Sequence, residues 1–337
     1  MYGMSFFSQS TDGILSAVGQ TPLVALRQIY PEIPFHLYAK LEALNPGGSI
    51  KDRPAREILH ESIRRGDVRP GTVIIESSSG NMGIGLAQAC AYYGLRFICV
   101  VDVKTSRQNR ELLQIYGAEI DCVRDPDPET GELLPARLRR VRELMAEIGD
   151  AFWPNQYANE HNSGAHFRTT MREIATALDH KLDLLLCATS TCGTVRGCGE
   201  YAREHGMATR VIAVDSVGSL IFSDQKGPRY LPGMGAGLCP PLCDLRFIDE
   251  HVLVSDLECV LACRRLVRSE GILAGASSGG LIAAVGKIRD RIPEGSTCVV
   301  VLPDRGERYI DTVYSDAWVK DHFGDVPDLW PEKKGSL

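Results

Sequence analysis

Residues 72–93 read TVIIESSSGNMGIGLAQACAYY, which joins a short apolar run, a small polar loop and a longer apolar stretch. The run at 72–76 is nearly continuous in apolar residues, which is typical of a strand buried on both faces of a parallel sheet. The stretch at 81–93 has the length of a helix and starts directly after Gly80. A strand, a glycine-containing loop and a helix in this order predict an open α/β sheet.

The same alternation continues on both sides of this stretch. Further strands are expected at 96–102, 119–123, 183–188, 210–215 and 297–302. Helices are expected at 52–65, 107–116, 136–148, 164–178, 194–205, 257–270 and 279–288. Alternating elements of this kind favour parallel strands with right-handed crossovers. We therefore predict an α/β fold with two open twisted sheets flanked by helices, and a surface loop over 124–135 near a domain boundary.

Composition excludes several classes of protein. The chain has 337 residues, 44% hydrophobic and 24% charged, which argues against disorder, collagen and coiled coil and suggests about two domains. The net charge of −6 disfavours a general role on nucleic acids or membrane surfaces. Apolar runs such as 97–101 are too short to span a membrane, and the N-terminal residues lack the basic region of a signal peptide. We expect a cytoplasmic protein.

The eleven cysteines do not suggest a disulfide framework. Their number is odd, and most lie in expected strands or helices, where free cysteine is a common core residue. No CxxC pattern occurs, so the spacing typical of zinc modules is missing. We expect no metal site.

Four small-residue loops are candidate ligand sites, because ligands of open α/β sheets bind where strands end and helices begin. The first, at 45–53, reads NPGGSIKDR and places Lys51 at a helix start. A lysine there opposes the helix dipole, which makes it an odd choice for stability. It is either a solvated lysine beside a capping Asp52 or a lysine that forms a Schiff base.

The other three loops are equally ambiguous one by one. The loop at 76–83 (ESSSGNMG) could hold a carboxylate or merely cap a helix. The loop at 189–197 (TSTCGTVRG) offers hydroxyls at a helix start for a phosphate, and it matches neither a P-loop nor a dinucleotide turn. The loop at 275–280 (GASSGG) offers a serine that could face a heterocyclic nitrogen.

Taken together and in this order, the loops resemble the cysteine synthase family of fold-type II pyridoxal-phosphate enzymes. The resemblance extends to LPDRGERY at 302–309 and to VGQTPL at 18–23, and it covers about residues 14–320. It implies a tryptophan synthase β-like fold. It also implies a smaller mobile domain at 48–154, a larger cofactor-binding domain at 12–47 plus 155–320, and a homodimer.

The resemblance implies a role for each matched residue. Lys51 matches the catalytic lysine that holds pyridoxal 5′-phosphate, Asn81 the asparagine at its 3′-oxygen, and Ser277 the serine at its ring nitrogen. A serine there does not enforce ring protonation, which favours β-elimination. The phosphate cup would be formed by Ser190, Thr191, Cys192, Gly193 and Thr194. The substrate α-carboxylate would be held by Ser78, Ser79, Gly80 and Met82, with Gln156 nearby.

Several stretches depart from plain cysteine synthases. The cup reads STCGT, with Ser190 and Cys192 in place of glycines, and the stretches at 155–160, 213–219, 231–235 and 313–318 resemble one subgroup. This subgroup comprises the N-(2-amino-2-carboxyethyl)-L-glutamate synthases, which serve 2,3-diaminopropionate formation in staphyloferrin B-type siderophore biosynthesis. The implied reaction is a β-replacement: O-phospho-L-serine loses phosphate to leave an α-aminoacrylate, to which the amino group of L-glutamate adds.

A phosphate leaving group needs cationic or hydroxyl partners. We predict that Arg137, Tyr157 and Ser190 supply them, although Arg137 could instead lie on a solvated helix face. His166 could be a cap or a residue of a dimer face. The alternating charges at 304–308 are expected to close an ion-pair network.

Two rival functions remain open from the sequence. A cysteine synthase using O-phosphoserine or O-acetylserine with sulfide would differ only in its acceptor, since sulfide needs no recognition site whereas glutamate brings two carboxylates. A catalytically silent partner that regulates another enzyme is disfavoured by the intact Lys51, Asn81 and Ser277.

Overall fold

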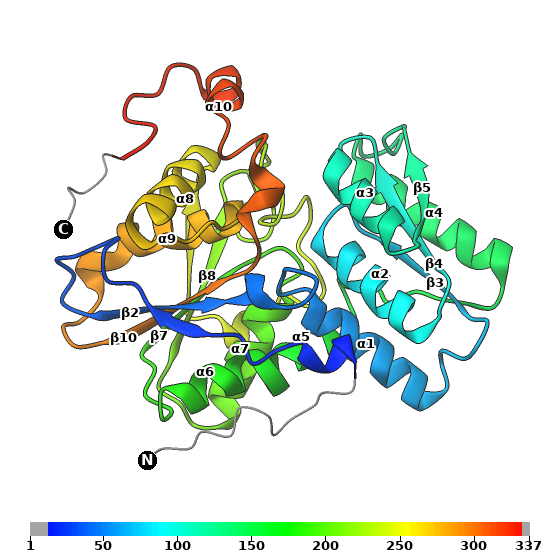
Figure 1. The fold of residues 1–337 in the computed structure, drawn as a ribbon, viewed down its shortest axis with the longest axis horizontal. Helices are drawn as coiled ribbons and strands as arrows, with labels where there is room; N and C mark the ends of the chain where they lie inside the picture. The colour runs from blue at the N-terminus through cyan, green and yellow to red at the C-terminus, as the bar shows by residue number, and fades with distance from the viewer. Residues whose placement is uncertain (1–12, 332–337) are drawn as a thin grey trace, which may run out of the picture.

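The computed structural model describes residues 13–331 and has two sheets with helices packed against them (Figure 1). The larger sheet has the strand order β1-β2-β10-β7-β8-β9, and β1 is its antiparallel edge. The other neighbours in this sheet run parallel. Its strands are β1 (Leu23–Ala25), β2 (His36–Leu41), β7 (Leu184–Ala188), β8 (Arg210–Ser216), β9 (Glu250–Val254) and β10 (Thr297–Leu302).

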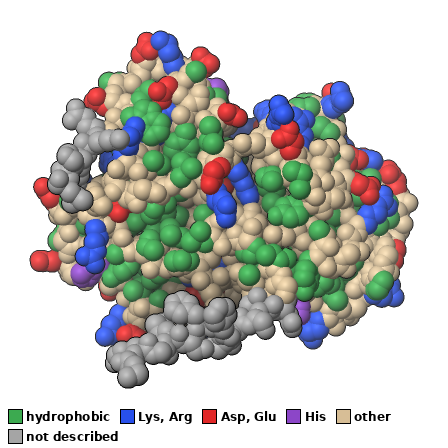
Figure 2. Space-filling view, in the orientation of Figure 1, with side chains coloured by type: hydrophobic (Ala, Val, Ile, Leu, Met, Phe, Trp, Pro, Cys, Tyr) green, Lys and Arg blue, Asp and Glu red, His purple; other side chains and the backbone are tan. Residues whose placement is uncertain are grey.

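The smaller sheet is entirely parallel, in the order β5-β4-β3-β6. Its strands are β3 (Val73–Ser77), β4 (Phe97–Asp102), β5 (Glu119–Val123) and β6 (Ala151–Phe152). The α/β fold with two sheets flanked by helices is therefore confirmed. Figure 2 shows that acidic and basic side chains meet in the middle of the molecule's face, where the two halves adjoin.

Helices cover both faces of each sheet. The main ones are α1 (Asp52–Arg65), α2 (Asn81–Tyr93), α3 (Arg107–Ile115), α4 (Leu133–Ile148), α5 (Glu160–Ala165), α6 (Arg172–Ala177), α7 (Gly193–Glu204), α8 (Asp256–Glu270), α9 (Ala276–Ile288) and α10 (Asp316–Phe323). Alternate residues of the central strands bury against opposite helix layers. Leu184 and Leu186 of β7 belong to the core under α8 and α9, whereas Leu185 faces α6 and α7. This double burial explains why these strands are apolar without interruption.

The smaller sheet is covered in the same way, with α1, α2 and α3 on one face and α4 on the other. Helix α1 packs against both α2 and α5, so it lies between the two halves (Figure 1). The division into a smaller domain at 48–154 and a larger one at 12–47 plus 155–320 remains a prediction, and residue 12 lies outside the described residues.

Four strands are missing from the sequence prediction. Strands β1 and β6 are very short, with 3 and 2 residues. Strand β9 is a sheet edge on which only Val252 and Val254 are buried. Strand β2 contains Lys40, which is buried and interrupts its apolar pattern. The prediction missed β2 because it relied on unbroken apolar runs.

Two helix predictions need correction. The helix expected at 164–178 starts earlier, as α5, and continues through a π-helical turn at His166–Met171 into α6. The loop expected at 124–135 ends at Glu132, because Pro135 lies in the first turn of α4, where proline is tolerated. Since α4 packs back onto β3 and β4, this loop lies within the smaller sheet's half.

A buried cluster of charges joins α1 to the larger sheet's half. The guanidinium of Arg53 donates Nε to Glu42 at 2.6 Å and Nη1 to Glu173 at 2.6 Å. Lys40 of β2 adds a bond of 2.6 Å from Nζ to Glu173. Although burial opposes ionisation, the bonds from Arg53 and Lys40 hold the pKa of Glu173 down at about 2. The cluster fixes α1, and thereby the residues just before it, against β2 and α6.

Removing the guanidinium should therefore destabilise the fold. Arg53→Met leaves the fully buried Glu42 without its partner, and breaking a buried pair in this way costs about 3–5 kcal/mol. Equilibrium unfolding in urea measures this loss. Arg64→Met on the exposed face of α1 is the control and should change stability by less than about 0.5 kcal/mol. Equal losses for both variants would contradict the prediction.

Candidate active site

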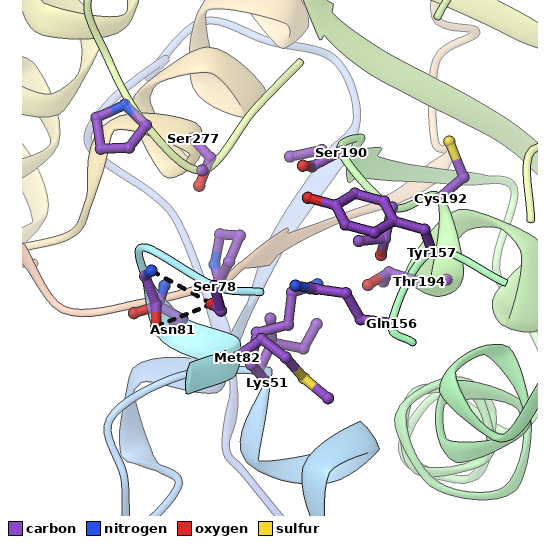
Figure 3. Close-up of a pocket in the computed structure, with 18 of the residues that line it drawn as sticks. Lys51, Ser78, Asn81, Met82, Gln156, Tyr157, Ser190, Cys192, Thr194 and Ser277 are labelled. Atoms are coloured by element: carbon purple, nitrogen blue, oxygen red, sulfur yellow. Dashed lines mark hydrogen bonds between the residues drawn. The ribbon is translucent and has the colours of Figure 1, made fainter. Parts of the chain in front are cut away.

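Every residue predicted for the site lines one cavity, where loops from both halves meet (Figure 3). The cavity collects Lys51, Ser78, Ser79, Gly80, Asn81, Met82, Arg137, Gln156, Tyr157, Ser190, Thr191, Cys192, Gly193, Thr194 and Ser277. The loops follow β3, β7 and β10 or precede α1 and α9, so the carboxyl ends of parallel strands converge here as expected. The individual roles of these residues remain predictions, and their surroundings are described below.

Lys51 is held at the cavity by the backbone around it. The preceding residue, Ile50, donates its N–H to the carbonyl of Pro303 at 2.8 Å, and Ser49 forms a bridge with Asp304. Burial lowers the pKa of Lys51 to about 8, while the Asp304 carboxylate opposes this fall. About a tenth of an amine with this pKa is unprotonated at pH 7, far more than for an ordinary lysine, and a nucleophilic lysine requires the unprotonated form. Lys51 is half-buried and lines the cavity, which disagrees with a freely solvated lysine on an open helix surface.

The predicted phosphate cup surrounds the N-terminus of α7. Cys192 precedes the helix with φ of 62°, and no side chain among residues 13–331 caps the helix's first N–H groups. The hydroxyl of Thr191 accepts a bond of 3.2 Å from Asn162. A Cβ on Gly193 would lie 2.2 Å from the Asn162 Oδ1, so only glycine fits beside this amide. Uncapped N–H groups at a helix start are suited to bind an anion.

His166 lies behind the cup rather than on a surface. It is fully buried, its Nε2 lies 3.3 Å from Thr194 Oγ1, and its Nδ1 lies 3.0 Å from Thr170 Oγ1. Burial, followed by the charges of Lys51 and Arg53, holds the pKa of His166 well below its usual range. The ring is therefore neutral and supports a cup hydroxyl, so the expectation of a cap or a dimer-face residue is wrong.

The loop before α2 has its own internal hydrogen bonds. Ser78 Oγ accepts N–H groups from Gly80 at 3.3 Å and from Gly83 at 2.9 Å. This hydroxyl therefore caps α2, as the structural alternative for the loop suggested, while the residue still borders the cavity. Gln156 donates Nε2 to the Ser77 carbonyl at 3.1 Å, which ties its side chain to the end of β3.

Asn81 lies at the start of α2 and is bonded at both ends of its amide. Nδ2 donates to Asp304 Oδ2 at 2.7 Å, and Oδ1 accepts from Arg308 Nη1. Asp304 also accepts the hydroxyl of Tyr309 at 2.8 Å. Within the described chain, none of the charged residues at 304–308 enters an ion pair. The expected ion-pair network is therefore wrong, because Asp304 is buried and turned toward Asn81.

Ser277 lies in the first turn of α9, after Gly275 at the helix start. No side chain in the described part of the chain caps this helix either. Pro232 and Gly233 form the wall beside Ser277 and were not predicted as site residues. Their stretch at 231–235 was noted only for its resemblance to a subgroup, although its proline and two glycines are the usual signal of a close-packed loop.

Arg137 lies in α4 with its side chain buried at the cavity. Nε is 3.2 Å from Asp102 Oδ2, yet neither Nε nor Nη1 makes a hydrogen bond within residues 13–331. Only 7% of the residue's surface is exposed, so the alternative of a solvated helix face is wrong. Burial raises the pKa of the neighbouring Tyr157, whose hydroxyl therefore stays protonated and can donate.

These features fit a phosphate-bearing aldehyde that binds an amine. The cavity combines two uncapped helix N-termini, an amine with a lowered pKa and buried guanidinium donors without partners. Pyridoxal 5′-phosphate carries the anion and the aldehyde that this set accepts. Lys51 would hold its aldehyde, the cup at 190–194 its phosphate, and Ser277 its ring nitrogen.

The lowered pKa of Lys51 leads to a measurable result in the cofactor-free protein. Labelling of Lys51 by an amine-selective reagent, quantified by peptide mass spectrometry across pH, should reach half its maximal rate near pH 8. Exposed lysines in the same digests serve as the internal control. A midpoint at the ordinary value of 10.5 would contradict the burial of this amine.

Comparison with known proteins agrees with this geometry. Residues 14–304 match the family described as pyridoxal-phosphate dependent enzyme. O-ureido-L-serine synthase is 31% identical with a TM-score of 0.85, and the match covers 95% of this chain and 98% of that one. O-acetylserine dependent cystathionine β-synthase from Helicobacter pylori is 32% identical, with a TM-score of 0.84 and coverages of 91% and 100%.

A third similar structure is O-acetylserine sulfhydrylase isoform 3 from Entamoeba histolytica. It is 30% identical with a TM-score of 0.85, and the match covers 100% of this chain and 96% of that one. The family match spans most of the chain, and these structures match it over nearly their whole lengths. The chain therefore belongs to the family of pyridoxal-phosphate dependent enzymes.

Proposed function

We propose that this protein is a transferase that joins O-phospho-L-serine and L-glutamate to give N-(2-amino-2-carboxyethyl)-L-glutamate and phosphate. The family and its relatives support the reaction type: the protein is a pyridoxal-phosphate dependent enzyme of the β-replacement type, related to cysteine synthase and O-ureido-L-serine synthase. The two substrates are the proposal, and the buried guanidinium of Arg137 is the observation that carries the phosphorylated donor.

The chain's own residues supply the acid–base and binding steps. When bound, pyridoxal phosphate withdraws electrons from Cα of an amino acid, which lets a Cα proton and a β leaving group depart. Lys51, with a pKa of about 8, can take the Cα proton and later return it. The loop at 78–82 offers backbone N–H groups at the start of α2 to a substrate carboxylate.

The charge of the cavity wall favours a phosphorylated donor. Arg137 is buried, and its Nε and Nη1 lack hydrogen-bond partners within residues 13–331. Arg137 already has one carboxylate neighbour, Asp102, but its unbonded N–H donors are costly to bury, and a phosphate dianion would satisfy them better than a neutral acetyl ester. Tyr157 and Ser190 border the same cavity and add hydroxyl groups. These three residues support O-phosphoserine as the donor.

The acceptor rests on sequence resemblance. The stretches at 155–160, 213–219, 231–235 and 313–318 resemble the synthases that use L-glutamate, and the cup has Ser190 and Cys192 where plain cysteine synthases have glycines. The resemblance also implies a homodimer and a role in 2,3-diaminopropionate and siderophore biosynthesis, and the cytoplasmic location expected from the sequence composition is part of the proposal. No helix of residues 13–331 has both the length and the apolar character needed to cross a membrane.

A competition experiment separates this function from its nearest alternative, a cysteine synthase that uses sulfide. The enzyme loaded with pyridoxal phosphate is given O-phosphoserine with equal concentrations of L-glutamate and sulfide, and the products are identified by mass spectrometry. We expect the N-linked diamino diacid to dominate. Cysteine as the main product would instead establish the cysteine synthase.

The role of Arg137 can be tested through donor choice. A charge-assisted bond to a buried anion contributes about 1.5–3 kcal/mol, so Arg137→Ala should lower kcat/KM for O-phosphoserine by roughly ten- to a hundredfold. Turnover of O-acetylserine should change little, because its leaving group carries less charge. Steady-state kinetics with both donors measure the difference.

Arg142→Ala, on the exposed side of the same helix, is the matched control and should leave both donors unaffected. Equal losses for both donors in Arg137→Ala would assign Arg137 to folding or domain arrangement instead of donor recognition.

A further inference from the structure

The segment that follows β10 brings three side chains to the edge of the cavity. Asp304 is buried, and its Oδ2 accepts bonds from Asn81 and from the hydroxyl of Tyr309, at 2.7 and 2.8 Å. Arg308 donates Nη1 to Asn81 Oδ1 and Nη2 to the Gly47 carbonyl at 2.6 Å. Asn81 belongs to the smaller sheet's half, so these contacts reach across from the larger half.

The two charged groups leave the Asn81 amide only one favourable orientation. Its nitrogen faces the carboxylate of Asp304, and its oxygen faces the guanidinium of Arg308. A flipped amide would oppose its oxygen to the Asp304 carboxylate and its NH₂ group to the Arg308 donors. Because Nδ2 has two hydrogens and gives one to Asp304, a second N–H remains for a ligand.

Asp304 is itself held firmly in place. Its carbonyl accepts the N–H of Gly275 at 3.1 Å, and its backbone pairs with Ser49, two residues before Lys51. A Cβ on Gly275 would lie 2.0 Å from Asp304 Oδ1 and 2.6 Å from the Tyr309 ring. The carboxylate is therefore packed against the loop before α9 and has little freedom to turn away from Asn81.

We propose that Asp304 is a positioning residue, which together with Arg308 fixes the Asn81 amide so that it presents an N–H donor to an acceptor oxygen in the cavity. Asp304 acts through Asn81 and does not touch the reacting atoms. The inference rests on the proposed function only in taking pyridoxal phosphate as the cavity's ligand, and it is independent of the donor and acceptor substrates.

The charge of Asp304 makes this proposal testable by replacing the amide nitrogen of Asn81 with an oxygen. Asn81→Asp keeps the shape but places a carboxylate against Asp304, whereas Asn81→Ala only removes the amide. The dissociation constant of pyridoxal phosphate, measured by equilibrium dialysis, should therefore rise more in Asn81→Asp than in Asn81→Ala. Adding Asp304→Asn to Asn81→Asp should lower this dissociation constant at least about threefold relative to Asn81→Asp alone, because the two carboxylates no longer face each other.

Matched variants on the same segment provide the controls. Glu307 and Arg305 are exposed and do not contact Asn81, so Glu307→Gln should fail to rescue Asn81→Asp. Arg308→Gln should weaken cofactor binding, whereas Arg305→Gln should not. The absorption band of the bound cofactor gives a second readout, which should shift in Asp304→Asn and stay unchanged in Glu307→Gln.

The outcomes separate this inference from the proposed function. If Asp304→Asn gives no rescue and its effect simply multiplies with that of Asn81→Asp, the positioning role is overturned. If Asn81→Asp does not fold, the cycle of Asn81→Ala with Arg308→Gln decides, and multiplicative effects again overturn the proposal. If the Asn81 and Asp304 substitutions are coupled as expected but the enzyme does not join O-phosphoserine to glutamate, only the proposed substrates are refuted.

Discussion

The site depends first on one pairing of backbone segments, between the residues just before α1 and those just after β10. The N–H of Ile50 and the carbonyl of Pro303 join them, and the bridge from Ser49 to Asp304 extends the pairing. Lys51 follows this junction directly, so the larger sheet, through the segment after β10, fixes the position of the Lys51 backbone. The charge cluster around Arg53 then fixes the first turn of α1 from the other side.

Two buried arginines illustrate how the same side chain can serve stability or binding. Arg53 has bonds from all three guanidinium nitrogens to Glu42, Glu173 and Thr21, so little capacity is left for a ligand. Arg137 has one close carboxylate, Asp102, and donors without hydrogen-bond partners in the described chain. Incomplete pairing of a buried cation beside a cavity is thus the more informative sign of a binding site.

Apolar runs and small-residue loops predicted the central strands, most helices and the residues around the cavity. The runs work because β3, β4, β7 and β10 are buried on both faces, so nearly every position must be apolar. Strand β2 was not predicted because the charge of its buried Lys40 is paired with Glu173, which lies 133 residues away in sequence. The hydrogen bonds of Asp304 and Arg308 with Asn81 were not predicted for the same reason. Both residues are far from Asn81 in sequence, and their charges resemble an ordinary surface pattern.

The π-helical turn at His166–Met171 sets the rotation of α6 relative to α5, and these two helices contact different parts of the molecule. On its N-terminal side α5 carries Asn162, which bonds Thr191 in the cup, and on its C-terminal side α6 carries Glu173, which bonds Arg53. Deleting one residue from the turn would rotate α6 relative to α5 by about 100°. The wide turn therefore keeps both helices in register, and a shorter, regular helix could satisfy only one of these contacts.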